Sequence, residues 1–363
     1  MLTNVILFIA GLVTLLAGAE SLVRGASRIA LSFGVTPLVV GLTIVALGTS
    51  SPELAVSIGA VLAGNSDLAI GNVIGSNIFN VLVILGLSAI AAPLVIHAQV
   101  VRQEVPIMIG AALLLAVVIL DARLGRLDGA LLLALLSGYV VFLVRQARAA
   151  TRQTQHEYEE AMPRRNAWDR HWFVQLLLIA AGLGLLVLGS DWLVKSSVAF
   201  ARALGVSDLI IGLTIIAAGT SLPEVATSVL AALRGERDIA VGNAIGSSTF
   251  NILGCLGASG LVSSGGLTIA PAVMHFDLWV MVAVSVACLP VFMARRQIGR
   301  LTGIAFIAYY AAYVTYLILD AQGHDALPEF SSIMIGFVLP ITVVTLVALV
   351  VRNQQKKLTR DPH

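Results

Sequence analysis

Residues 41–53 read GLTIVALGTSSPE, and residues 212–224 read GLTIIAAGTSLPE. The likeness continues beyond these stretches, because residues 41–86 align with residues 212–257 without a gap at a constant spacing of 171 positions. In this alignment 27 of the 46 residue pairs are identical, and many of them are polar residues or glycines. Shared hydrophobic composition alone would not produce such a match, so the chain contains a duplicated unit.

Long apolar segments make up most of both copies of this unit. The 363 residues are 58% hydrophobic and only 12% charged, whereas a typical globular chain is about 25% charged. A membrane-spanning helix needs about 20 mainly apolar residues. Eleven such segments are expected, at residues 3–22, 36–63, 69–92, 105–120, 128–144, 173–193, 207–233, 239–262, 276–294, 301–319 and 333–351. The composition therefore excludes an ordinary soluble enzyme and predicts an all-α polytopic membrane protein.

A polar segment from Arg145 to His171 divides these spans into five before it and six after it. Because five is odd, the second copy enters the membrane from the opposite side, which predicts two inverted-topology five-helix repeats and one extra C-terminal helix. The expected regions are a first repeat, a cytoplasmic loop, a second repeat, and an additional helix with a basic tail, at 1–147, 148–171, 172–322 and 323–363. With the N-terminus outside, 18 of the 22 Lys and Arg residues face the cytoplasm, which predicts an N-out/C-in topology.

Two carboxylates define the candidate functional site. Of the 20 Asp and Glu residues, only Glu53 and Glu224 lie near the middle of a predicted span. A carboxylate at that depth costs several kcal/mol or more unless something compensates, so it indicates a functional site. Since the two residues occupy equivalent positions in the repeats, we expect them to face each other across the pseudo-twofold axis. Their two negative charges suit one divalent cation or several monovalent ones.

The residues around these carboxylates offer further oxygen ligands. Pro52 and Pro223 lack a backbone N–H, so each frees a carbonyl one turn earlier in its helix, and freed carbonyls at membrane depth are tolerated where they line a cavity or bind an ion. Side chains four residues apart share a helix face. Four such pairs occur: Thr49 with Glu53, Ser76 with Asn80, Thr220 with Glu224, and Ser247 with Asn251. Such oxygens are hard ligands, which suit calcium and sodium.

Other repeated residues are interpreted as structural. Glycines spaced four apart predict close helix packing, as in Gly71 with Gly75 and Gly242 with Gly246. Opposite charges spaced four apart at span ends predict interfacial ion pairs, as in Glu20 with Arg24 and Asp191 with Lys195.

The paired G-T-S-x-P-E segments, each followed by a G-N-x-x-G-S run that ends in F-N, resemble the two α-repeats of the sodium/calcium exchangers of the Ca²⁺/cation antiporter superfamily, prokaryotic type. The resemblance covers roughly residues 5 to 320. It implies a compact core of the second, third, seventh and eighth helices that holds the ions, and first and sixth helices that slide against this core. It also implies an electrogenic exchange, commonly three sodium ions for one calcium ion.

The resemblance assigns roles to individual residues. It implies that Glu53 and Glu224 are carboxylate ligands shared by calcium and sodium. The remaining implied ligands are hydroxyl, amide and backbone oxygens, of Thr49, Thr220, Ser50, Ser221, Ser76, Ser247, Asn80, Asn251, Ala46 and Ala217. Some family members have an aspartate at one of the central positions, whereas this chain has asparagine at both Asn80 and Asn251. The candidate site therefore carries only two formal charges.

We expect a secondary active antiporter that exchanges Na⁺ for Ca²⁺ by alternating access, and not an enzyme. An H⁺- or K⁺-dependent exchanger of the same superfamily and a cation channel are open alternatives, while an intramembrane hydrolase is disfavoured because no nucleophile with an orienting base is present. The expected partners are the transported Ca²⁺ and Na⁺ ions and membrane lipid, with no cofactor, nucleic acid or obligate protein partner. The expected location is the inner membrane, as a multi-pass protein.

Overall fold

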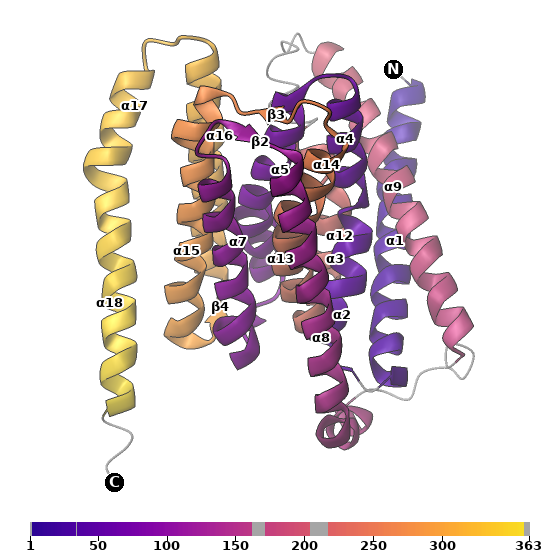
Figure 1. Cartoon of the computed structure of the whole chain (residues 1–363). Coiled ribbons are helices and arrows are strands. Elements are labelled where there is room, and N and C mark those ends of the chain that lie inside the picture. The colour runs from indigo at the N-terminus through magenta and orange to yellow at the C-terminus, as the bar shows by residue number, and fades with distance from the viewer. Residues whose placement is uncertain (1, 34, 162–170, 204–216, 359–363) are drawn as a thin grey trace.

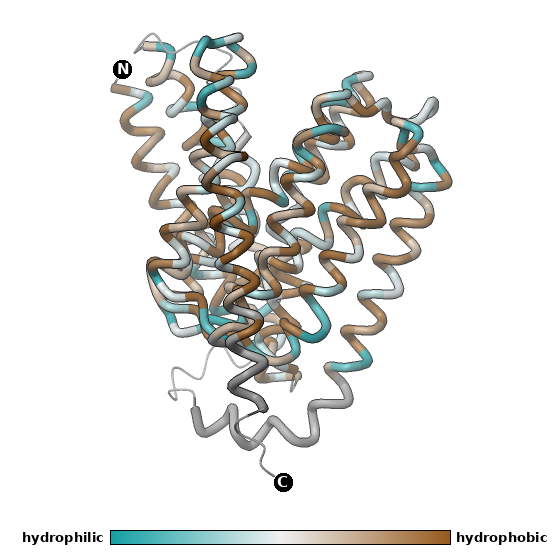
Figure 2. Tube along the Cα trace, turned by 90° about the vertical axis from the view of Figure 1, so that its left-hand side faces the viewer, coloured by the Kyte–Doolittle hydropathy of each residue, from teal (hydrophilic) through white to brown (hydrophobic). Residues whose placement is uncertain are grey.

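The computed structural model describes residues 2–33, 35–161, 171–203 and 217–358. Within these residues the chain forms a bundle of long helices with two short strand pairs (Figure 1). Nine of the described helices are long and apolar enough to cross a membrane, and a pair of helices bent by 41° makes a tenth candidate span. Figure 2 shows hydrophobic residues along the length of these helices. The all-α polytopic fold is thereby confirmed.

The first half of the chain runs from the long helix α1 to the end of α8. Its elements are α1 (Leu2–Phe33), α2 (Pro37–Val40), η1 (Gly41–Val45), α3 (Ala46–Thr49), α4 (Ser51–Leu62), α5 (Ser66–Phe79), η2 (Asn80–Ile84), α6 (Leu85–Ala91), β1 (Leu94–Val95), η3 (Val100–Glu104), α7 (Val105–Val118), β2 (Arg123–Leu124) and α8 (Arg126–Ala161). The η elements are wider π-helical turns within longer helices. The apolar part of α8 that is a candidate membrane span ends at Ala147, and the helix continues to Ala161.

The second half has a closely similar order of elements. They are α9 (Trp172–Ala203), α11 (Ala217–Gly219), α12 (Leu222–Leu233), α13 (Arg237–Phe250), η6 (Asn251–Leu256), α14 (Gly257–Val262), β3 (Leu267–Thr268), η7 (Val273–Asp277), α15 (Leu278–Arg295), β4 (Gln297–Ile298), α16 (Arg300–Ala321), α17 (Leu327–Ile333), η8 (Met334–Val338) and α18 (Leu339–Leu358). Of the predicted seventh span, residues 207–216 lie outside the described residues. The total of eleven spans and the N-out/C-in orientation therefore stay predictions.

The strand pairs show how the two halves interlock. Strand β1 pairs antiparallel with β4, and β2 pairs antiparallel with β3, so each pair takes one strand from each half. In Figure 1 the β2–β3 pair lies near the top of the bundle and β4 lies near the bottom. Strands β1 and β3 hold equivalent places in the two halves, after α6 and after α14. They lie at opposite ends of the bundle, as two inverted repeats require.

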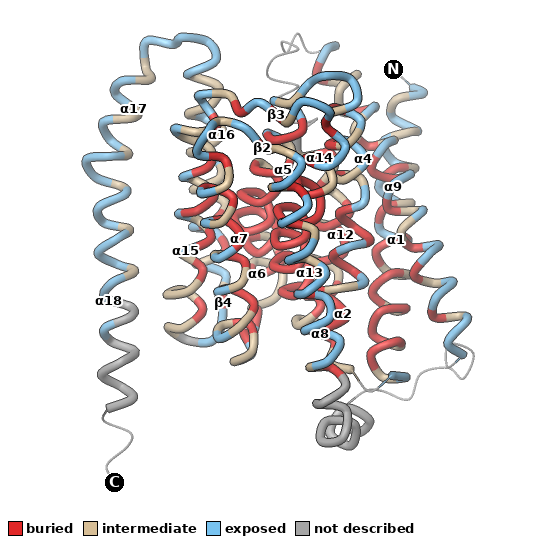
Figure 3. Tube along the Cα trace, viewed as in Figure 1, coloured by how far each residue is buried: buried red, intermediate tan, exposed pale blue. Residues whose placement is uncertain are grey.

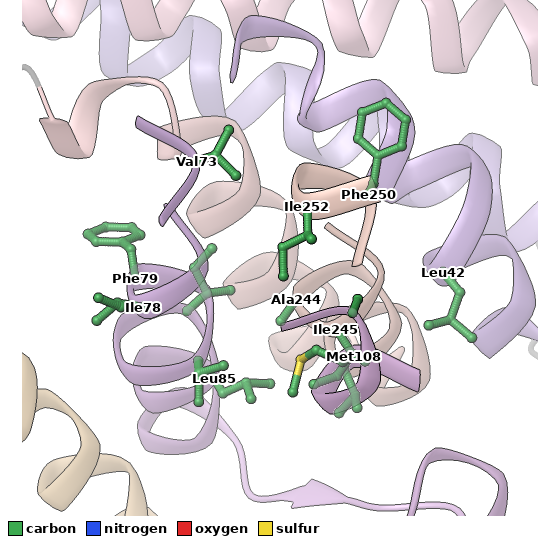
Figure 4. Close-up of a cluster of buried hydrophobic side chains, with 14 of the residues drawn as sticks. Leu42, Val73, Ile78, Phe79, Leu85, Met108, Ala244, Ile245, Phe250 and Ile252 are labelled. Carbon is green, nitrogen blue, oxygen red and sulfur yellow. The ribbon is translucent and has the colours of Figure 1, made fainter. Parts of the chain in front are cut away.

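The most buried spans lie at the centre of the bundle. The apolar window of Arg237–Val262 is 100% buried and that of Ser66–Ala91 is 83% buried, and Figure 3 shows buried residues concentrated there. Apolar side chains from different helices meet in this region, among them Ile78, Met108 and Ile252 (Figure 4). The span formed by α17, η8 and α18 lies at the periphery, and its apolar window has no buried residues.

Helices α1 and α9 pack against each other along one side of the core (Figure 1). Glycines make this close approach possible, because a Cβ atom on Gly182 would lie 2.7 Å from the backbone nitrogen of Leu22 and 2.9 Å from the carbonyl oxygen of Gly18. Backbone-to-backbone packing of this kind makes α1 and α9 a single paired unit beside the core.

Candidate ion-binding site

Two helix breaks create the candidate site. Helix α3 ends at Thr49 and α4 begins at Ser51, so Ser50 lies at the bend, with φ −81° and ψ 7°. In the second repeat Ser221 lies before α12 with nearly the same backbone angles, φ −90° and ψ 6°. Each break is followed by a proline in the first turn of the next helix, where a missing N–H costs little. The breaks therefore follow from the repeated S-x-P-E sequence.

The two carboxylates just after these breaks are held by serines of the opposite repeat. The Ser221 hydroxyl donates to Glu53 Oε1 at 2.9 Å, and the Ser50 hydroxyl donates to Glu224 Oε1 at 3.0 Å. Glu53 is 0% exposed and Glu224 is 1% exposed. The crossed pattern shows that the equivalent S-x-P-E segments of the two repeats contact each other.

Each carboxylate leaves its second oxygen free. Within the described residues, Glu53 Oε2 and Glu224 Oε2 have no hydrogen-bond partner, and neither does Asn80 Oδ1. Asn80 and Asn251 begin the π-helical turns η2 and η6, and turns of this kind often occur at functional sites. These buried oxygens are acceptors without donors, which is the arrangement that a bound cation would complete.

Neutral oxygens from the same four helices lie beside the carboxylates. Ser221 Oγ lies 3.3 Å from Ser76 Oγ, and the Ser247 hydroxyl donates to the carbonyl of Ala46 at 3.5 Å. Both serines are buried. Hydrogen bonds thus connect Ser221 with Glu53 and Ser76, Ser50 with Glu224, and Ser247 with Ala46. Asn80 and Asn251 are buried at the starts of η2 and η6, and the role of the twelve residues as ion ligands stays a prediction. Ala217 begins α11, and its side chain is not among those described.

Two residues that the sequence analysis did not single out complete the arrangement. The side-chain amide of Asn243 donates to Ser228 Oγ at 2.9 Å and to the carbonyl of Glu224 at 3.4 Å. Its oxygen accepts from Thr49 Oγ1 of the other repeat at 3.0 Å. Asn243 therefore holds the backbone at Glu224 and connects it to Thr49, the last residue of α3 in the other repeat. Its position in the repeated G-N-x-x-G-S run was a signal available in the sequence.

Asn72 makes the equivalent contacts in the first repeat. Its amide donates to Ser57 Oγ at 3.0 Å and to the carbonyl of Glu53 at 3.2 Å, and its oxygen accepts from Thr220 Oγ1 at 3.4 Å. Thr220 and Asn72 are partly exposed, whereas Thr49 and Asn243 are 1% and 0% exposed. One half of this symmetric network is therefore more accessible than the other.

The packing interpretation of the repeated glycines is confirmed in the second repeat. A Cβ atom on Gly242 would lie 2.8 Å from the Leu38 carbonyl oxygen, and one on Gly246 would lie 2.8 Å from the Leu42 Cα atom. The residues equivalent to this neighbouring segment, 208–216, lie outside the described residues, so the interpretation of Gly71 and Gly75 stays a prediction.

The interpretation of these charges as ion pairs is confirmed on α9, and Glu20 also forms an ion pair. Lys195 Nζ lies 2.7 Å from Asp191 Oδ2. Glu20 Oε2 lies 2.6 Å from Arg234 Nη2, and Arg234 directly follows α12 on another part of the chain. Spacing along one helix does not identify a partner that tertiary packing brings from another.

The site is built from two carboxylates and neutral oxygens. Among the residues that the structure describes, no three His, Cys, Asp or Glu side chains gather at one place. Oxygen-only ligand sets suit hard cations such as calcium and sodium, not zinc or copper. Together with the inverted repeats, this site defines a polytopic membrane transporter for cations.

Comparison with known proteins identifies the family. The sodium/calcium exchanger protein family profile matches residues 3–145 and 174–319. The chain belongs to this family, whose members are membrane ion exchangers and not enzymes. The protein is accordingly a cation/Ca²⁺ antiporter.

Relatives and solved structures agree with this assignment. The chain is 39% identical to the putative antiporter CaxA of Alkalimonas amylolytica, over 85% of this chain and 98% of CaxA. It is 34% identical to the sodium/calcium exchanger MaX1 of Methanosarcina acetivorans, over 86% of this chain and 98% of MaX1. The solved structure of the sodium-calcium exchanger NCX_Mj superposes with a TM-score of 0.73 at 30% identity, over 87% of this chain and 98% of that chain.

Proposed function

We propose that the protein exchanges Na⁺ for Ca²⁺ by alternating access and that the ions bind between Glu53 and Glu224. The observation that carries this proposal is the pair of buried carboxylates, each with one oxygen held by a serine of the other repeat and one oxygen without a donor among the described residues. Two ionised carboxylates at this depth are costly without a counter-charge. A bound cation supplies that charge.

The proposed ligands divide into charged and neutral groups. Glu53 and Glu224 provide the negative charge for both ions. The neutral oxygens come from Thr49, Thr220, Ser50, Ser221, Ser76, Ser247, Asn80 and Asn251, and from the backbone at Ala46 and Ala217. Calcium takes six to eight oxygen ligands in flexible geometry, and this set is large enough to provide them. Competition follows because calcium and sodium share the two carboxylates.

The charge of the site sets the expected voltage dependence. One calcium ion neutralises the two carboxylates, whereas three sodium ions leave one net positive charge. Moving one charge across the membrane corresponds to about 2.3 kcal/mol per 100 mV. Under this stoichiometry the membrane potential drives calcium export, and a flux that is indifferent to voltage would exclude it.

The proposed moving parts are the α1–α9 pair and the core that holds the site. Alternating access requires that two rigid bodies change their relative position while the site stays intact. The glycine-to-glycine packing of α1 on α9 supports treating them as one body, and the crossed hydrogen bonds between the repeats support treating the core as the other.

We also place the protein in the inner membrane, in line with the relative named inner membrane protein YrbG of Escherichia coli, to which the chain is 37% identical.

The decisive experiment is calcium-45 uptake into proteoliposomes loaded with sodium and diluted into sodium-free or sodium-matched buffer. Uptake only with the outward sodium gradient, lost in Glu53→Gln, supports both the coupling ion and the site. Glu329→Gln is a matched control, because Glu329 lies exposed on the peripheral α17. Uptake that is independent of sodium but requires a pH gradient or potassium would show that the coupling ion is H⁺ or K⁺ and not Na⁺. Downhill flux far above exchanger rates would indicate a channel.

A further inference from the structure

An ion pair between Glu20 and Arg234 connects the α1–α9 pair to the core. Arg234 Nη2 lies 2.6 Å from Glu20 Oε2, and the two side chains are 48% and 37% exposed. Glu20 lies on α1, and Arg234 directly follows α12 at the turn into α13. The contact therefore joins two elements that must separate if α1 moves relative to the core.

The equivalent position in the other repeat has no such contact within the described residues. Ala63 replaces Arg234 at the turn between α4 and α5. Asp191 replaces Glu20, and it pairs with Lys195 on its own helix, at 2.7 Å. The ion pair is therefore an asymmetric feature added to a symmetric fold.

The same asymmetry occurs at the candidate site. Asn243 lies in the second turn of α13, which begins three residues after Arg234. Its contact with Thr49, on this side of the site, is 3.0 Å long and buried. The equivalent contact of Thr220 with Asn72, on the side of Ala63, is 3.4 Å long and partly exposed. The site is thus more closed toward the end of the bundle that carries the ion pair.

We propose that Glu20 and Arg234 form an ionic latch that holds α1 against the α12–α13 turn while the site is open toward the opposite end. The ion pair breaks when the site opens toward the end of the bundle where Glu20 and Arg234 lie. This inference rests on the proposed alternating access. In the predicted orientation the latched end faces the cytoplasm, so the latch favours the state that is open to the outside.

The strength of the latch sets the expected effect. Partly exposed ion pairs are weak and are screened by salt. Breaking one is expected to raise the population of the state that is open at the latched end by about two- to fivefold. Because apparent affinity scales with the fraction of binding-competent protein, the apparent calcium affinity measured from that face rises by the same factor.

The test compares four variants in oriented proteoliposomes. Arg234→Ala installs the residue of the other repeat, and Glu20→Gln removes only the charge. Both are expected to raise the apparent calcium affinity at the latched face about two- to fivefold, and the exchanged pair Glu20→Lys with Arg234→Glu is expected to restore the wild-type value. Lys195→Ala, which breaks the pair within α9, is the matched control. Unchanged affinity in Arg234→Ala, or an equal shift in Lys195→Ala, would overturn the latch.

Hydrogen exchange separates the latch from the proposed coupling. In detergent, backbone amides of residues 231–240 are expected to exchange faster in Arg234→Ala than in wild type, and to slow again in the exchanged pair. This measurement does not depend on transport. Absence of sodium-driven uptake in the wild type would refute the proposed function, and hydrogen exchange would still test the latch. Equal exchange in wild type and Arg234→Ala would refute the latch even where sodium-driven uptake is intact.

Discussion

Substitution of Ser50 by alanine tests how the carboxylates are held. The Ser50 hydroxyl donates to Glu224 Oε1 at 3.0 Å, and Glu224 Oε2 has no donor among the described residues. Ser50→Ala therefore removes a side-chain hydrogen bond from this buried carboxylate. A hydrogen bond to a charged group contributes about 1.5–3 kcal/mol, and the loss falls on the ionised, correctly placed form that binds the cation.

This free energy corresponds to calcium binding that is about 10- to 100-fold weaker. The assay is the calcium concentration that half-saturates calcium-45 uptake into sodium-loaded proteoliposomes. The shift in melting temperature with added calcium gives an independent measure of binding in detergent.

Ser51→Ala provides the control from the adjacent position. Ser51 is exposed, and its hydroxyl donates to the carbonyl of Leu47 at 3.0 Å. This variant is expected to bind calcium as the wild type does. The reasoning would be refuted by a half-saturating concentration in Ser50→Ala within about twofold of the wild type, which is well below the change expected for this bond.

Three further outcomes are expected. Glu53→Gln or Glu224→Gln abolishes calcium flux while the protein still elutes as a folded species, because each removes half of the charge of the site; near-normal flux in either variant would contradict this role. Gly182→Leu places a bulky side chain where a Cβ atom alone would lie 2.7 Å from the backbone nitrogen of Leu22, so the melting temperature falls by several degrees through separation of α1 and α9; an unchanged melting temperature would show that these helices do not pack as described. Burial raises the pKa of Glu236, in the turn before α13, above its ordinary range, so the folded protein is destabilised as pH rises above about 4.3, the usual value for glutamate. Glu236→Gln is therefore expected to have a higher melting temperature than the wild type at pH 7.5 but not at pH 4.5. A difference in melting temperature that is the same at both pH values would contradict a raised pKa of Glu236.

The sequence by itself determined the class of fold and the two central carboxylates. Hydrophobic segments of membrane-spanning length, the ungapped repeat and its odd number of spans depend only on local composition and on comparison of the chain with itself. Glu53 and Glu224 were identifiable because a carboxylate in the middle of an apolar span is conspicuous without knowledge of its neighbours. The expectation that these two residues face each other across the pseudo-twofold axis followed from the same observations.

Only the tertiary structure decided which side chains meet. Ser50 donates to Glu224 and Ser221 donates to Glu53, and Glu20 pairs with Arg234, which lies on another part of the chain. The role of Asn243 as a bridge between the repeats was likewise absent from the sequence interpretation. Helical periodicity fixes which residues share a face of one helix, because that geometry is local. Contacts between helices depend on their relative position and rotation in the bundle, which packing of the whole chain determines.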